Sequence, residues 1–172
     1  KGITSGYLPL GATSVTGAVF DAFRGAPGEG REFAQVCTYG GHAACCAAAL
    51  ANIDIIVGER LWENAAQVGD HLLAGLQSLS SPILGQVRGL GLMLGVELVD
   101  GTGALLDARR TARVKNALKA QGVLVGQMSH AVIGPNSILV LSPPLVLTRA
   151  EADRIVDAFR QALEGPALVA GE

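Results

Sequence analysis

The feature that most constrains this 172-residue chain is a run of small residues near its centre. Residues 43–51 read AACCAAALA, and together with the apolar positions that follow they predict a helix from His42 to Val57. Such a helix has small side chains on almost every face, so other elements can approach it closely from several sides. We therefore expect a buried helix rather than an amphipathic surface helix. The run is far shorter than the roughly 20 apolar residues of a membrane span, so no membrane association is expected.

The composition is that of a folded protein. Apolar residues make up 49% of the chain and charged residues only 16%, which excludes intrinsic disorder. The net charge is −2 and no basic run is present, so nucleic acid is not an expected partner. Three cysteines, two of them adjacent, are more typical of a reduced cytoplasmic protein than of a disulfide framework. The first residue is Lys1 rather than Met, which indicates a cut chain or part of a longer protein.

Caps and periodicity predict the other elements of the first half. A short strand is expected at 11–15, then a helix capped by Thr16 that extends to Phe23, then a loop over 26–41. After Gly58, apolar residues recur every three or four positions up to Leu79, which predicts an amphipathic helix. The Ser-Ser-Pro sequence that follows favours a domain boundary after residue 81.

The second half is predicted to be a small α+β unit. A single buried strand is expected over 87–99, although three glycines interrupt it, and further strands are expected over 122–126 and 137–141. A charged helix is predicted over 107–121, with Gly122 at its end. The sequence Thr-Arg-Ala-Glu at 148–151 is a capping box that predicts the start of the last helix.

The sequence contains no recognisable metal or nucleotide motif. His42, His71 and His130 are far apart, and neither CxxC nor HExxH spacing occurs, so no metal site is predicted. Cys45 and Cys46 would point about 100° apart on a helix and could not share one ion, so we interpret them as small buried thiols. A GxGxxG motif, a Walker loop and a GxSxG elbow are also missing.

Four segments carry a family resemblance. In chain order they read KGITSGYLPLGA, TYGGHAACCAAALANIDII, VRGLGLMLGVELV and ILVLSPPLVLTRAEADRIVDAF. They resemble four segments of class III pyridoxal-phosphate-dependent aminotransferases, in the same order. The first two resemble the segment around the cofactor lysine and the TYSGHP segment with its Ala-rich helix. The last two resemble the first strand of the small domain and its closing strand and helix. The resemblance extends from Lys1 to about Phe159 but corresponds only to the C-terminal part of such an enzyme.

The resemblance implies a fold class, a reaction and partners. The fold would be α/β of fold type I: residues 1–81 would end the large cofactor-binding domain with its connecting helices, and residues 82–172 would be the small C-terminal α+β domain. The intact enzyme would be a cytoplasmic homodimer or dimer of dimers. It would carry pyridoxal 5′-phosphate and move an amino group from an amine or ω-amino acid to a 2-oxo acid such as pyruvate in a ping-pong transamination. The missing N-terminal half would be a required partner, so the fragment alone would be inactive.

The resemblance also assigns site residues. Lys1 aligns with the catalytic lysine that forms a Schiff base with the cofactor. An amine attacks an aldehyde only when it is neutral, so this role requires a lowered pKa of the lysine amine. Thr38 aligns with the threonine that reaches across the dimer to the cofactor phosphate; alternatively, it simply caps the helix after Gly41. Tyr7 could pack near the cofactor, although core or interface packing is an equal alternative.

The chain departs from the family pattern at two places. SGYLPLG resembles the amine and ω-amino-acid:pyruvate branch, and in several members of this branch an arginine shortly before the SPPL turn binds the substrate carboxylate. Segment 127–137 contains no arginine, and only His130 could carry positive charge there. Gln35, Val36 and Cys37 replace the usual His-Gly pair and its neighbour, and Ala43 replaces a proline, so phosphate binding is expected to differ. A decarboxylase, an aminomutase or a non-catalytic packing and oligomerisation module would keep the same pattern, and these alternatives stay open.

Overall fold

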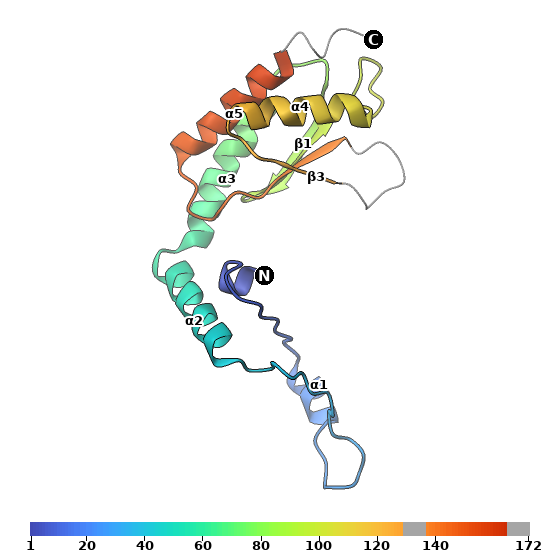
Figure 1. Cartoon of the computed structure of the whole chain (residues 1–172), viewed down its shortest axis with the longest axis vertical. Helices are drawn as coiled ribbons and strands as arrows, with labels where there is room; N and C mark the ends of the chain where they lie inside the picture. The colour runs from blue at the N-terminus through green and yellow to red at the C-terminus, as the bar shows by residue number, and fades with distance from the viewer. Residues whose placement is uncertain (129–136, 165–172) are drawn as a thin grey trace. The chain divides into compact units, whose positions relative to one another are not determined.

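A computed structural model describes residues 1–128 and 137–164 of the chain (Figure 1). The chain forms two compact units, Lys1–Arg60 and Leu61–Glu172. Helix α3 (Leu61–Gln77) therefore belongs with the second unit in this chain. The domain boundary predicted after residue 81 stays a prediction.

The first unit consists of three helical elements joined by irregular segments. These are the 3-10 turn η1 (Gly2–Thr4), α1 (Gly17–Ala22) and α2 (Ala43–Gly58). Thr16 caps α1 as predicted, because its hydroxyl accepts a hydrogen bond from the amide of Val19 at 3.4 Å. The strand predicted at 11–15 is wrong: this segment is irregular, and residues 1–60 contain no strand with which it could pair.

Helix α2 forms where the run of small residues predicts it, but its surroundings differ from the prediction. Only Cys45 and Ala49 are buried, whereas the side chains of Leu50 and Val57 are 62% and 57% exposed. Within the first unit, η1 is the element that packs on this helix, and it covers one face. The expectation of a helix buried on several sides is thus not met within this chain.

The second unit is built on a four-stranded antiparallel sheet in the order β1-β2-β4-β3. The single strand predicted over 87–99 is wrong, because this segment forms a hairpin of β1 (Leu84–Leu90) and β2 (Met93–Leu98). Gly91 turns the chain with a φ of 54°, and the next residue, Leu92, is buried. An apolar turn of this kind carries none of the polar residues by which a hairpin is usually recognised.

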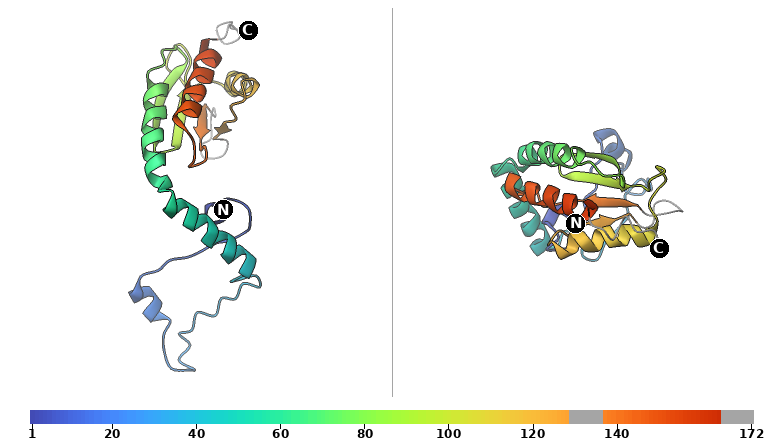
Figure 2. Two further views of the ribbon diagram at one scale, coloured as in Figure 1. Left: turned by 90° about the vertical axis from the view of Figure 1, so that its left-hand side faces the viewer. Right: turned by 90° about the horizontal axis from the view of Figure 1, so that it is seen from above.

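Three helices cover one face of this sheet, with α5 (Arg149–Glu164) between α3 and α4 (Ala108–Ala120) (Figure 2). The burial of side chains alternates along β2, as this arrangement requires. Leu94, Val96 and Leu98 are buried, whereas the residues between them are more exposed to solvent. The core between the layers holds large side chains that are fully shielded from water: Phe159, Leu72, Leu76, Leu98, Leu106, Leu118 and Leu139. No helix among the described residues has the length and hydropathy of a membrane span.

The ends of α4 follow the predicted pattern, but the strand after it is shorter. Asp107 caps α4 through a 2.9 Å hydrogen bond from the amide of Arg110, and Gly122 follows its end with a φ of 81°. Residues 122–125 connect this helix to β3 (Gly126–Gln127), so most of the strand predicted over 122–126 is absent. The last predicted strand is confirmed as β4 (Ile138–Leu141).

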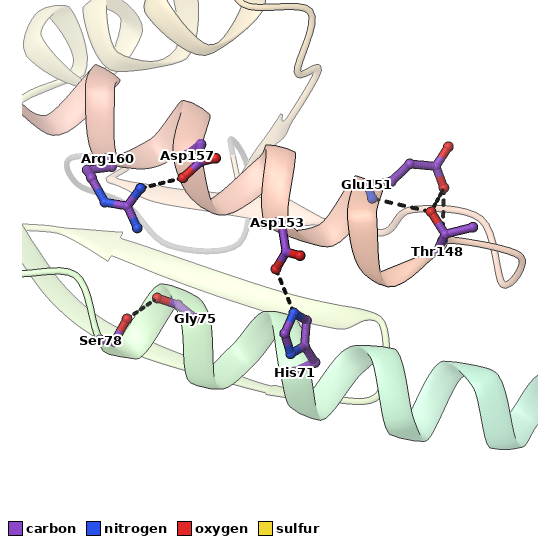
Figure 3. A network of polar contacts seen from close by, with 8 residues as sticks. All are labelled: His71, Gly75, Ser78, Thr148, Glu151, Asp153, Asp157 and Arg160. Carbon is purple, nitrogen blue, oxygen red and sulfur yellow. Dashed lines mark hydrogen bonds and ion pairs between the residues drawn. The ribbon is translucent and has the colours of Figure 1, made fainter.

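Polar contacts join α5 to α3 and close its N-terminal end (Figure 3). The imidazole Nε2 of His71 on α3 lies 2.6 Å from a carboxylate oxygen of Asp153 on α5. The predicted capping box is confirmed: the carboxylate of Glu151 accepts hydrogen bonds from the amide and the hydroxyl of Thr148, both at 2.8 Å. The Thr148 hydroxyl accepts in turn from the amide of Glu151 at 3.2 Å.

Helix α3 crosses the β1–β2 turn at a buried glycine. A Cβ atom on Gly69 would lie 2.2 Å from both the carbonyl carbon and the carbonyl oxygen of Gly91. Backbone atoms cannot move aside as a flexible side chain can, so the absence of a side chain at residue 69 sets how closely the helix approaches the hairpin.

We expect Gly69→Ala to destabilise the second unit by about 1 to 3 kcal/mol, because the added methyl group overpacks this crossing. Urea unfolding followed by circular dichroism would measure the loss. Gly101→Ala is the matched control, since a Cβ atom there would meet nothing within 4 Å. A Gly69→Ala variant as stable as this control would contradict the close crossing.

The capping box makes stability depend on pH. Hydrogen bonds from the backbone amide and then the hydroxyl of Thr148 hold the pKa of Glu151 below its ordinary 4.5. Because this pKa is lower in the folded than in the unfolded state, the stabilisation is present above pH 4.5 and is lost as the pH falls through the folded value. We expect Glu151→Gln to flatten the fall in unfolding free energy below pH 4.5, measured by urea titration. Glu164→Gln, at the other end of α5, is the control, and an equal flattening there would contradict this assignment.

Candidate active site

The backbone around Lys1 is fixed by a tight turn. The carbonyl of Lys1 accepts hydrogen bonds from the amides of Thr4 and Gly6 at 3.4 and 3.0 Å. The chain can fold back in this way because Ser5 and Gly6 adopt left-handed φ angles of 52° and 80°. The side chain of Lys1 is exposed, so a short rigid turn presents its primary amine at the surface of the first unit.

Lys1 also contributes to the lining of an open hollow of about 660 Å³. Its lining consists of Lys1 and residues 6–11, which include the GYLPL sequence. Tyr7 therefore lines the same hollow as Lys1, and its ring is 85% exposed. Core packing of Tyr7, one of the two alternatives, does not occur in this chain.

Thr4 stabilises the segment that lines the hollow. Its side chain is 98% buried, and its hydroxyl donates to the carbonyl of Leu8 while accepting from the Leu8 amide at 3.3 Å. Two hydrogen bonds to one residue fix the path of the chain from the turn into GYLPL. In the sequence, Thr4 is only one residue of the segment KGITSGYLPLGA. Its role could not be predicted there, because it depends on a contact with Leu8 that forms in the folded chain.

Asn52 ties the same turn to α2. Its side-chain amide donates to the carbonyls of Gly2 and Ile3, each at 3.2 Å. Figure 1 shows this turn beside the middle of α2. Sequence reasoning missed Asn52; the signal available was a single amide side chain in a helix of mostly small and apolar residues.

Thr38 lies on a second turn, which precedes α2. The N-cap of α2 is His42, which makes no capping hydrogen bond through its side chain, and Thr38 is not the cap. The alternative that Thr38 simply caps this helix is therefore wrong. A Cβ atom on Gly40 would lie 3.1 Å from the Cys37 carbonyl, and Gly41 has a φ of 68°, so the backbone of this turn is compact. Thr38 is not among the residues that line the hollow at Lys1.

The remaining candidate residues are placed as follows. His130 and most of segment 127–137 lie outside the described residues. Cys45 is buried and Cys46 is half-buried, as expected for small packed thiols, while Cys37 beside Thr38 is exposed. Within the described parts of the chain, no three His, Cys, Asp or Glu side chains come together to form a metal site.

Comparison with known proteins identifies the family. The model of the aminotransferase class-III family matches residues 1–163. The chain belongs to this family. The resemblance carried by the four segments is thereby confirmed, as is the predicted α/β fold class with its small α+β part.

The similar proteins are much longer than this chain. A taurine–pyruvate aminotransferase of Bilophila wadsworthia is 40% identical over 168 residues, which are 94% of this chain and 37% of that protein. The crystal structure of a Bacillus anthracis aminotransferase has a TM-score of 0.89 and 41% identity over 94% of this chain and 37% of that one. An amine transaminase from an uncultivated Pseudomonas species, solved with pyridoxal phosphate bound, has a TM-score of 0.83 and 40% identity over 94% and 36% of the two chains. The chain thus spans little more than a third of the length of these relatives.

We expect Thr4→Val, which keeps the side-chain shape but removes the hydroxyl, to free the Leu8 amide. Loss of one hydrogen bond worth about 1 kcal/mol corresponds to roughly fivefold faster hydrogen exchange at that amide. The measurement is amide exchange by NMR or mass spectrometry, with Thr13→Val at an exposed position of the next loop as control. Unchanged exchange at Leu8 would show that the hydroxyl does not hold this segment.

Proposed function

We propose that this chain is the C-terminal part of a pyridoxal-phosphate-dependent transaminase. The enzyme moves an amino group from an amine or ω-amino acid to a 2-oxo acid such as pyruvate. The observation that carries the proposal is the primary amine of Lys1, presented by a hydrogen-bonded turn at the edge of an open hollow. Membership of the class III family and the names of the taurine–pyruvate and amine transaminase relatives support it.

The chemistry of the two candidate residues fits this cofactor. A primary amine such as Lys1 can bond covalently to an aldehyde carbon, and the hollow beside it is open to a ligand. The hydroxyl of Thr38, on a turn with compact backbone, is suited to donate to phosphate oxygens. When bound, pyridoxal phosphate supplies the electron sink for chemistry at the substrate carbon.

Lys1 has two roles in this proposal. Its Nζ atom holds the cofactor while no substrate is bound, and for this it must be neutral at the moment of bonding. Once a donor amine has taken its place, the free Nζ would accept the proton from the donor carbon and would deliver it to the cofactor carbon to which Lys1 had been bonded. The turn fixes the backbone from which the side chain of Lys1 extends, which favours both roles because proton transfer requires hydrogen-bonding distance.

Thr38 is proposed to serve the cofactor of a second copy of the chain. It does not line the hollow at Lys1, which agrees with a role across a subunit interface. The proposal therefore includes a homodimer or dimer of dimers. The three free cysteines support a reduced, cytoplasmic setting.

The first unit is proposed to pack against the N-terminal half of the same enzyme. Large apolar side chains that a stable protein usually covers are exposed on it: Phe20, Phe33, Val36, Tyr39, Leu50 and Val57. Residues 1–81 would complete the large domain, with residues 82–172 as the small domain. Without the N-terminal half, we propose that the 172 residues neither hold the cofactor nor catalyse.

The decisive test uses the intact enzyme. We expect Lys1→Ala to abolish the visible absorption band of the bound cofactor, and borohydride to fix the cofactor on the Lys1 peptide of the unmodified enzyme, as detected by mass spectrometry. Lys119→Ala, at an exposed lysine of α4, is the control and should keep both signals. The isolated chain mixed with pyridoxal phosphate should develop no such band.

Three outcomes would contradict the proposed function. A Lys1→Ala enzyme that keeps its absorption band would remove the anchoring role of this residue. Carbon dioxide or an isomerised substrate as the product would identify a decarboxylase or an aminomutase instead. A band in the isolated chain would overturn the proposed need for the N-terminal half.

A further inference from the structure

One stripe of α2 faces the turn that carries Lys1. Cys45, Ala49, Asn52 and Ile56 are spaced by four, three and four residues, which places them on the same face of the helix. Cys45 and Ala49 are buried, and Asn52 and Ile56 are half-buried. The small side chains allow η1 to approach the helix closely, and Asn52 contributes the only amide side chain of the stripe.

The orientation of the Asn52 amide follows from its partners. Both contacts of its Nδ2 atom, at 3.2 Å each, are backbone carbonyl oxygens, of Gly2 and Ile3. Carbonyls only accept hydrogen bonds, so the NH₂ group must face them, and its two hydrogens match the two acceptors. One side chain on a regular helix therefore fixes two consecutive peptide groups.

These peptide groups directly follow Lys1. The Lys1 carbonyl is itself bonded to the amide of Gly6, so three successive carbonyls, from Lys1 to Ile3, are held in place. The turn is short and exposed, and the side chain of Asn52 joins residues 2 and 3 to the long helix α2. A shift of the turn would move the Cα atom of Lys1, and with it the amine.

We propose that Asn52 is a positioning residue that sets where the Lys1 amine lies relative to the cofactor. This inference rests on the proposed function, since it concerns the bonding of Lys1 to pyridoxal phosphate. In this role Asn52 acts through the Gly2 and Ile3 carbonyls to which it donates, rather than by contact with the cofactor or the substrate. Bond formation depends steeply on the placement of the reacting atoms, so loosening the turn slows attachment even when the protein stays folded.

The chain contains a matched control for this role. Asn64 on α3 also donates from Nδ2 to two carbonyls, those of Leu145 and Leu147, at 2.7 and 3.1 Å. It belongs to the second unit and holds the turn before α5 rather than the Lys1 turn. Loss of the amide donor at residue 64 therefore measures the general cost of losing such a side-chain contact.

The test compares Asn52→Leu and Asn64→Leu in the intact enzyme after removal of the cofactor. Pyridoxal phosphate is added back, the rate at which the visible band grows is measured, and borohydride trapping with mass spectrometry confirms attachment at Lys1. We expect Asn52→Leu to slow attachment by roughly 10- to 100-fold and Asn64→Leu to attach at the rate of the unmodified enzyme. Thermal unfolding of both variants shows whether their losses of stability are similar.

A second substitution makes the test independent of one variant. Asn52→Asp keeps the size and polarity of the side chain but lacks the amide donors, and it should also slow attachment. Attachment at the unmodified rate in either folded Asn52 variant, or an equal slowing in Asn64→Leu, would overturn the positioning role while leaving the proposed function intact. If the unmodified enzyme gives no adduct at Lys1, both proposals fail together.

Discussion

The hydrogen bonds on the carbonyls of residues 1–3 are the interaction on which the candidate site depends. A lysine side chain is a flexible four-carbon stem, so its amine can be localised only if the backbone from which it extends is fixed. Here the Gly6 amide closes the turn onto the Lys1 carbonyl, and Asn52 attaches the two following carbonyls to α2. The helix with small residues therefore supplies a rigid support for an otherwise exposed turn.

The two units of the chain reach different degrees of internal packing. The second unit encloses its own core, because three helices cover one face of its sheet and Phe159 and its leucine neighbours are shielded from water. In the first unit the buried side chains are few, and the aromatic rings of Phe20, Phe33 and Tyr39 are exposed. This contrast supports the proposal that the first unit packs against further protein, whereas the second unit encloses a core of its own.

Local signals in the sequence predicted the helices well and the strands less well. Thr16, Asp107, Thr148 and Gly122 mark helix ends, and each acts through groups within a few residues of itself. The hairpin at Gly91 was missed because its turn is apolar and buried, and strand 11–15 failed because a strand needs a partner that the first unit lacks. Lys1 and Thr38 are assigned as site residues only through the family resemblance. Asn52 donates to carbonyls 49 and 50 residues away, so its contact could not be predicted without the fold.

The most direct measurement of the central claim is a crystal structure of the intact protein with pyridoxal phosphate. We expect continuous electron density between Lys1 Nζ and the cofactor, the Asn52 amide bonded to the Gly2 and Ile3 carbonyls, and a Thr38 hydroxyl within hydrogen-bonding distance of a phosphate oxygen. Density that joins the cofactor to a different lysine, or a Lys1 side chain that points away from the cofactor into solvent, would contradict the assignment of Lys1 as the anchor.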